Sequence, residues 1–235
     1  MSTPDNQQDR TARDAGKDTI IQLIRRLASC NDIPHEVPAD PCQMLLSWFE
    51  QARTSGVYDD PNAMSLSTAT SYGAPSSRIV LCKSVELSPL AVVFYTSYTS
   101  RKASEIESNP RAAALFHWPH AKRQVRIEGG VKRVSEKESD EYFNKRPLLS
   151  RIGAAASAQS APLASRDELI TKALHVAKST MLSGGLNRPK HWGGYRLFAH
   201  TVELWSAREG RLHDRVVWNQ DPTDVNRWTS HRLCS

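Results

Sequence analysis

The spacing of hydrophobic residues changes along the chain, and each change marks a predicted element. Residues 1–40 are mostly polar, with one amphipathic segment from Thr19 to Ala28, and predict a flexible N-terminal arm that docks only locally. Asp40-Pro41 is typical of a helix cap and first turn. The apolar residues behind it recur at helical spacing: Met44, Leu45, Trp48, Phe49 and Ala52. The folded domain is therefore expected to span residues 41–235.

Met64, Leu66 and Thr68 alternate along a predicted strand, and further strands are expected after it. The expected strands are residues 64–68, 78–85, 90–96, 112–118 and 124–134. Ser71-Tyr72-Gly73 predicts a turn that makes the first two a hairpin, and five strands in succession favour a closed barrel. Three more strands are expected over residues 195–207, 214–219 and 226–233, with a turn at Glu209-Gly210.

Helices are expected between these strands, so the fold class is α+β and mainly β. Ser100 is expected to cap a short helix that ends near Asn109-Pro110. Ser135 and Glu138 form a capping box for a helix that Pro147 ends. Ser165 and Glu168 open another helix that runs to about Leu182.

Composition narrows the class of protein. The 235 residues, 39% hydrophobic and 24% charged, suffice for one large domain or two small ones. No run approaches the roughly 18 apolar residues of a membrane span, and residues 1–18 lack the pattern of a signal or transit peptide, so we expect a cytoplasmic protein without a membrane partner. The cysteines, Cys30, Cys42, Cys82 and Cys234, are scattered, which indicates reduced thiols and no metal site.

The net charge of +6 changes this picture little, because the basic residues are dispersed rather than gathered in one tract. Binding of small phosphates explains the basic excess equally well, and we expect no nucleic-acid partner.

The most informative candidate chemistry lies in Arg211-Leu212-His213-Asp214-Arg215. In an extended strand, Arg211, His213 and Arg215 would share one face at a spacing of about 7 Å. Guanidinium groups bind oxyanions bidentately, and an imidazole can donate, accept or shuttle a proton near neutral pH. This row therefore predicts a site for a planar or phosphorylated anion; a solvated, charged edge strand is the alternative.

Two further segments carry cations near predicted strand ends. Arg78 and Lys83 are an odd number of positions apart, so one strand would present them to opposite faces and to two neighbouring anions, unless they are simply surface charges. Tyr95-Thr96 is followed by Ser100-Arg101-Lys102, where the free N–H groups of a helix start favour phosphate. Exposed basic residues on a helix are the alternative reading of the second segment.

Tyr142, Arg146 and Ser150 are spaced by four and four residues, which would align them on one helix. Pro147 interrupts a regular helix there. A bend that converges on one anion is therefore one interpretation, and a polar helix end is the other.

Taken together, these segments resemble one known family. The residues that carry the resemblance are Arg78 to Lys83, Tyr95-Thr96, Ser100-Arg101-Lys102, Arg123-Gln124-Val125, Gln159-Ser160, Trp192-Gly193-Gly194-Tyr195, Glu203-Leu204-Trp205 and Arg211 to Arg215. From about Asp40 to Leu233 the chain resembles the pyridoxine (pyridoxamine) 5′-phosphate oxidases. The resemblance implies an FMN-binding split β-barrel with flanking helices, and a homodimer with two FMN molecules at the subunit interface.

The resemblance also implies which residues form the site. Those expected to contact FMN are Arg78, Ile79, Val80, Leu81, Cys82, Lys83, Tyr95, Thr96, Arg101, Lys102, Gln124, Gln159, Ser160, Trp192 and Arg215. Those expected to bind the substrate are Lys83, Tyr142, Arg146 and Ser150, at its phosphate, and Arg211, Leu212 and His213. Arg211 and His213 are expected over the pyridine ring, as the catalytic pair.

The implied reaction is hydride transfer from pyridoxamine 5′-phosphate or pyridoxine 5′-phosphate to the flavin, followed by reoxidation with O2. Its products are pyridoxal 5′-phosphate and hydrogen peroxide, with ammonia from the amine. The sequence departs from the family pattern at Cys82 and in the small run Ala154-Ala155-Ala156. Two alternatives stay open: a flavin-dependent tailoring oxidase of the phenazine-pathway type, and a noncatalytic split-barrel protein that binds flavin, haem or nucleic acid.

Overall fold

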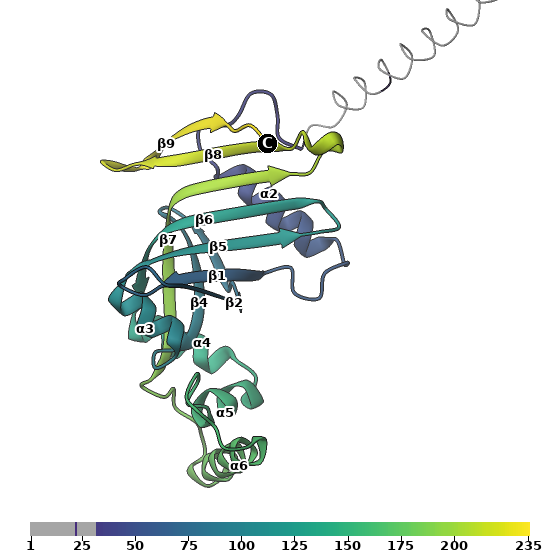
Figure 1. Cartoon of the computed structure of the whole chain (residues 1–235). Helices are drawn as coiled ribbons and strands as arrows, with labels where there is room; N and C mark the ends of the chain where they lie inside the picture. The colour runs from purple at the N-terminus through teal and green to yellow at the C-terminus, as the bar shows by residue number, and fades with distance from the viewer. Residues whose placement is uncertain (1–21, 23–31) are drawn as a thin grey trace, which may run out of the picture.

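The computed structural model describes Gln22 and residues 32–235 (Figure 1). Nine antiparallel strands form one sheet. They are β1 (Ala63–Ala69), β2 (Pro75–Leu81), β3 (Ser84–Leu87), β4 (Leu90–Ser97), β5 (Arg111–Trp118), β6 (Arg123–Arg133), β7 (Trp192–Ser206), β8 (Asp214–Asp221) and β9 (Asp224–Arg232). The order along the sheet is β2-β1-β5-β6-β7-β4-β3, and β8 and β9 extend it from the far part of β7.

The sheet is curled into a barrel with an open seam. Its path begins with β2 and ends with β3, yet these strands are consecutive in the chain and joined only by Cys82 and Lys83. The two edges of the sheet must therefore meet, and β2 and β3 are not paired in the ladder. This is the predicted α+β, mainly β, split barrel.

Two sequence-based expectations about the strands are wrong. The expected strand 78–85 is two strands, because the chain crosses at residues 82–83 from one edge of the sheet to the other. The first five expected strands do not close a barrel by themselves, because β7 lies between β6 and β4 and pairs with both. The hairpin of β1 and β2 is confirmed.

Helices flank the barrel (Figure 1). They are α2 (Cys42–Thr54), α3 (Arg101–Ser108), α4 (Glu136–Lys145), α5 (Leu148–Ala156), α6 (Arg166–Ser183) and the short 3-10 turn η1 (Glu209–Arg211). The capping box of Ser135 and Glu138 is confirmed, and the Ser165 hydroxyl accepts from the Glu168 N–H as expected. Helix α5 was not expected, although its alanine run favours a helix. None of the helices in the described residues is long and apolar enough to cross a membrane.

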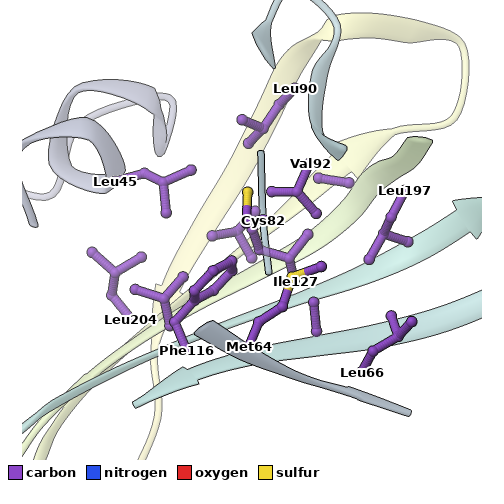
Figure 2. Close-up of a cluster of buried hydrophobic side chains, with 14 of the residues drawn as sticks. Leu45, Met64, Leu66, Cys82, Leu90, Val92, Phe116, Ile127, Leu197 and Leu204 are labelled. Atoms are coloured by element: carbon purple, nitrogen blue, oxygen red, sulfur yellow. The ribbon is translucent and has the colours of Figure 1, made fainter. Parts of the chain in front are cut away.

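The core fills the inside of the barrel beneath α2 (Figure 2). Its buried side chains come from α2 and from strands β1, β4, β5, β6, β7 and β8: Leu45, Met64, Leu66, Leu90, Val92, Phe116, Ile127, Leu197, Leu204 and Val216. Cys82 is only 4% exposed and its sulfur lies among these carbons, where it packs as a small hydrophobic residue (Figure 2).

The segment immediately before α2 lies against this barrel. Ile33 is 1% exposed and belongs to the core cluster, and Asp32 accepts hydrogen bonds from Arg123 and Ser206 at 2.9 and 2.6 Å. Most of the expected arm, including the amphipathic segment 19–28 apart from Gln22, lies outside the described residues. The domain boundary at residue 40 therefore stays a prediction.

Candidate functional site

A cationic cavity of about 820 Å³ opens along the barrel seam, between β2, β4 and α3 on one side and α4 and α5 on the other. Its polar lining combines cations, hydroxyls and an amide: Ser76, Ser77, Arg78, Lys83, Tyr95, Thr96, Arg101, Lys102, Tyr142, Lys145, Arg146, Ser150, Gln159 and Ser160. Ile79, Val80, Leu81, Pro147 and Trp192 complete it. Among the described residues no carboxylate lines this main cavity, so its electrostatics favour an anionic ligand.

Both Arg78 and Lys83 line this one cavity, so the expectation that they face opposite sides is wrong. That expectation assumed that Arg78 and Lys83 belong to one continuous strand, whose side chains alternate between its two faces. In the structure, β2 ends at Leu81 and Lys83 lies in the segment that crosses to β3. The two cations therefore line one cavity, and the two neighbouring anions that they are expected to bind stay a prediction.

A buried carboxylate orients two of the arginines. Glu105 of α3 is 4% exposed and accepts hydrogen bonds from Ser76 at 2.6 Å, from Arg101 Nε at 2.8 Å and from Thr68, and Arg78 Nη2 lies 3.4 Å away. Burial by itself would raise the pKa of this carboxyl, but these hydrogen bonds and the charge of Arg101 lower it to about 2. Glu105 is therefore ionised at neutral pH and holds both guanidinium groups at the cavity wall.

Lys102 is the most buried cation of the cavity, at 7% exposure. Its ammonium donates to Gln159 Oε1 at 2.9 Å, to Thr96 Oγ1 at 3.1 Å and to Ser100 Oγ at 3.2 Å. Burial, together with the charge of Arg78, lowers the pKa of Lys102 to about 8. Its hydrogen-bond partners among the described residues are all neutral, and the nearest charges are those of Arg78 and Glu105, so a ligand anion could bind this ammonium directly.

Aromatic rings and one arginine form the opposite wall. The rings of Tyr95, Tyr142 and Trp192 are nearly parallel, with Tyr95 and Tyr142 stacked at 3.9 Å between centroids. The Arg146 guanidinium lies 4.7 Å from the Trp192 ring centre, and its buried Nη1 has no hydrogen-bond partner among the described residues. Burial lowers the pKa of Arg146. An unpartnered buried donor in a cavity is a place where a ligand oxygen would bind.

The bend at Pro147 brings the predicted trio together. Helix α4 ends at Lys145, Arg146 has extended backbone angles, and α5 begins after Pro147. Tyr142, Arg146 and Ser150 nevertheless all line the main cavity. The bend therefore converges on one cavity, and the anion that it is expected to bind stays a prediction.

A second cluster lies at the other end of β7. Gln124, Trp205 and Arg215 line a separate depression of about 260 Å³ with Leu115, Arg126 and Glu203. Arg215 Nε donates to Glu203 Oε1 at 2.8 Å, and Arg126 Nη2 donates to Glu203 Oε2 at 2.6 Å. Trp192 and Trp205 are the ends of one long strand, roughly 40 Å apart along its path. One chain therefore does not bring this second cluster into its own main cavity.

The expected straight row of Arg211, His213 and Arg215 is wrong. Gly210 and Arg211 both have left-handed backbone angles, with φ of 63° and 62°, and β8 begins only at Asp214. Arg208 closes this loop through an ion pair with Asp214 at 2.7 Å. The backbone N–H of Arg208 donates to His213 Nδ1 at 3.1 Å, so a neutral His213 carries its proton on Nε2. The His213 ring lies 4.6 Å from that of Trp205, which places it beside the second cluster.

Comparison with known proteins decides the family. A family model described as pyridoxamine 5′-phosphate oxidase matches residues 51–179, and another, described as the pyridoxine 5′-phosphate oxidase C-terminal dimerisation region, matches residues 192–235. The chain belongs to the pyridoxamine 5′-phosphate oxidase family. It is therefore an oxidoreductase, and the family indicates a flavin as its cofactor.

Individual members of the pyridoxamine 5′-phosphate oxidase family match most of the chain. The pyridoxine/pyridoxamine 5′-phosphate oxidase of Herminiimonas arsenicoxydans is 45% identical over 198 residues, which cover 84% of this chain and 90% of that protein. The corresponding enzyme of Rubrobacter xylanophilus is 47% identical over 182 residues, 77% of this chain and 82% of that protein.

Solved structures agree with this fold. PhzG from Burkholderia lata 383, in complex with tetrahydrophenazine-1-carboxylic acid, superposes with a TM-score of 0.77 at 32% identity, covering 84% of this chain and 94% of that one. A pyridoxamine 5′-phosphate oxidase-related, FMN-binding protein from Nostoc punctiforme has a TM-score of 0.66 at 15% identity, covering 84% and 98%, and supports the fold alone.

The structure separates the predicted site residues into two groups. The main cavity is lined by Arg78, Ile79, Val80, Leu81, Lys83, Tyr95, Thr96, Arg101, Lys102, Tyr142, Arg146, Ser150, Gln159, Ser160 and Trp192. Outside it lie Gln124, Arg211, Leu212, His213 and Arg215, and Cys82, whose side chain is in the core. Within the described residues no group of His, Cys, Asp or Glu could hold a metal ion.

Sequence reasoning missed several residues of these sites, and Glu105 and Trp205 are the most informative of them. Glu105 orients the arginines, and its spacing of four residues from Arg101 on a predicted helix could have revealed the pair. Trp205 lines the depression with Gln124 and Arg215 and contacts His213. Its position between Gln124 and Arg215 follows only from the pairing of β7 with both β6 and β8.

Proposed function

We propose that this chain is an FMN-dependent oxidase that converts pyridoxamine 5′-phosphate and pyridoxine 5′-phosphate to pyridoxal 5′-phosphate. O2 accepts the electrons and becomes hydrogen peroxide; the amine substrate also consumes water and releases ammonia. The observation that carries this proposal is the main cavity, whose lining has two separate sets of phosphate-binding groups and no described carboxylate. The relatives that match most of the chain are named for both substrates.

The cavity fits FMN in size and charge. Its volume is within the usual range of about 300–1,000 Å³ for cofactor sites. Arg78, Arg101 and Lys102 form one phosphate-binding set, since Lys102 lacks a described anionic partner and guanidinium forks suit phosphate. When bound, the flavin would supply a two-electron acceptor that can be reoxidised by O2.

The second set of groups suits the phosphate of the substrate. Arg146 offers the unpartnered Nη1, and Tyr142 and Ser150 offer hydroxyls beside it, with Lys83 on the facing wall. These groups would anchor the substrate and fix its orientation, which is the main contribution a protein makes when a cofactor carries the chemistry.

Arg211 and His213 are proposed to complete the site from the partner subunit. The dimerisation region of the family covers residues 192–235, which include β7, the loop with Arg211 and His213, and Arg215. In a two-fold dimer, the second cluster of each protomer would face the main cavity of the other. Arg211 and the Nε2–H of His213 would then position the pyridine ring, and Gln124 and Arg215 would contact the flavin.

PhzG supports a second candidate, because it shares the fold at 32% identity and its structure holds tetrahydrophenazine-1-carboxylic acid. A tailoring oxidase of that kind would act on a carboxylated ring without a phosphate. The placement of Tyr142, Arg146 and Ser150 around an unpartnered donor favours the phosphorylated substrate. The cytoplasmic location stays a prediction.

The test is to load the purified chain with FMN, add pyridoxamine 5′-phosphate in air, and follow the aldehyde by absorbance and the peroxide by a coupled assay. We expect both products at catalytic turnover, and Arg211→Ala should lower turnover strongly while FMN stays bound. If flavin binds but no aldehyde forms, the substrate assignment is wrong and reduced phenazine acids become the next substrates to test.

A further inference from the structure

A buried arginine outside the cavity fastens the helix that carries the substrate-binding residues. Arg188 lies between α6 and β7, and its side chain is only 5% exposed. Nε donates to Asp140 Oδ1 at 2.6 Å, Nη1 donates to the backbone carbonyl of Trp192 at 2.6 Å, and Nη2 donates to Glu136. One guanidinium therefore joins two carboxylates of α4 to the first residue of β7.

Helix α4 meets its surroundings through distinct faces. Glu136 and Asp140, four residues apart, form the edge that Arg188 holds. Ser139 and Phe143 form the buried face: the Gly194 N–H donates to Ser139 Oγ at 3.3 Å, and the Phe143 ring packs edge-on against Trp192. A rotation of the helix would break both sets of contacts together.

The cavity side of the same helix has no comparable fastening. Tyr142 is held there by stacking on Tyr95, and Arg146 lies over Trp192 with its Nη1 unpartnered among the described residues. The positions of these two side chains therefore follow from where α4 lies relative to β7. Arg188 bears directly on that relation, because it contacts α4 and the Trp192 backbone at once.

We propose that Arg188 is the positioning residue for the substrate-phosphate half of the site. It contacts no ligand; it holds α4 against β7 so that Tyr142 and Arg146 meet the phosphate beside Trp192. The inference rests on the proposed function. Lysine cannot replace this residue fully, because a single ammonium does not reproduce three divergent planar donors.

A second ion cluster keeps α4 attached when Arg188 is removed. Arg196 of β7 donates to Glu138 at 2.6 Å and to both oxygens of Glu86 in β3, at 2.7 and 2.9 Å. This cluster holds the first turn of α4, whereas Asp140 lies a turn further toward Tyr142. Loss of Arg188 should therefore loosen the cavity end of the helix without unfolding the protein.

The experiment compares Arg188→Ala, Arg188→Lys and Asp140→Asn in the FMN-loaded full chain. For Arg188→Ala we expect the KM for pyridoxamine 5′-phosphate to rise about tenfold, with kcat and the Kd for FMN within about twofold, because substrate binding and not the reacting centre is disturbed. The preference for pyridoxamine 5′-phosphate over unphosphorylated pyridoxamine should fall by a similar factor. Arg188→Lys and Asp140→Asn should give values of KM between those of the native chain and Arg188→Ala.

The control is Arg53→Ala on the exposed surface of α2, which should match the native enzyme.

A double-mutant cycle with Arg146→Ala separates positioning from a general loss of stability. If Arg188 acts through Arg146, its removal in the Arg146→Ala background should change KM by less than about twofold. The inference would be overturned if Arg188→Ala raised KM tenfold both in the native chain and in the Arg146→Ala background. It would also be overturned if Arg188→Ala kept the native KM and the native preference for the phosphorylated substrate. If the native chain makes no aldehyde, the proposed function fails, but the positioning role of Arg188 can still be tested. Calorimetric titration with pyridoxamine 5′-phosphate then compares the native chain with Arg188→Ala, and an unchanged Kd would reject the positioning role.

Discussion

At the scale of single residues, Glu105 links stability to ligand binding. It is a buried anion that holds cations at the wall of a cavity built for anions. We expect Glu105→Gln to raise the Kd for FMN about tenfold, because the amide places N–H donors against the donors of Arg78 and Arg101. Fluorescence titration of FMN measures this effect, with Glu50→Gln on the exposed face of α2 as the control.

The same residue makes stability depend on pH. The pKa of Glu105 in the folded chain is about 2, below the ordinary value of 4.5, so its stabilising contribution is present above about pH 4.5 and is lost as the pH falls toward 2. The shift corresponds to roughly 3 kcal/mol of unfolding free energy. Urea unfolding should therefore show Glu105→Gln less stable than the native chain at pH 7, and the difference should narrow at pH 3. An equal difference at both pH values would contradict this role.

Lys102 should make flavin binding depend on pH in the alkaline range. Its pKa is lowered to about 8, so the ammonium is charged at pH 7 and loses its proton as the pH rises through 8 to 9. We expect the affinity for FMN to fall over that range, since the phosphate loses a cationic partner. Lys102→Arg should bind FMN with little change between pH 7 and 9, because the guanidinium stays charged. A native protein with constant affinity over this range would contradict the assignment of Lys102 to the phosphate.

At the scale of elements, β7 packs so closely against the Tyr98 side chain and against Ser139 of α4 that glycine is required at position 193. A Cβ on Gly193 would lie 2.1 Å from the Tyr98 hydroxyl and 2.9 Å from Ser139 Oγ. We expect Gly193→Ala to lower the unfolding free energy by about 1–3 kcal/mol, as other overpacked sites do. Thermal unfolding measures it, and Gly185→Ala is the matched control because nothing lies within 4 Å of its Cβ position. Equal melting temperatures for both variants would disprove the close contact.

At the scale of the whole molecule, the division of the predicted site into two clusters has a direct test. Arg146→Ala impairs the main cavity and Arg211→Ala impairs the second cluster. If each complete site uses one cluster from each protomer, a randomly mixed population of the two variants contains hybrid dimers with one intact site. We expect co-expression to restore about one quarter of native activity, because half of the dimers are hybrids and each has one of two sites intact. A mixture no more active than its parents would place both clusters in one protomer.

Local patterns in the sequence determined most of the elements and the residue types of the site. Capping residues at Ser135 and Ser165, the alternation in β1 and the continuous apolar run of β4 are decided by neighbours in the chain, so they were predictable without the fold. The cations and hydroxyls of the main cavity were identified in the same way, through short motifs and the resemblance that they support. Helix α5 was not predicted, because Pro147 at its N-cap ends the preceding helix and provides no side-chain cap that would mark a new one.

Only the tertiary structure decided how these pieces meet. Arg78 and Lys83 share a cavity because the chain crosses the barrel seam between them, which no count of residues along one strand could show. Arg211 leaves the expected row because Gly210 turns left-handed and Arg208 pairs with Asp214 across the loop. Glu105, Arg188 and Trp205 act through partners distant in sequence or on other elements. The sequence thus determined which chemical groups the protein has, through local preference, while the long-range pairing of strands decided which of them line the same cavity.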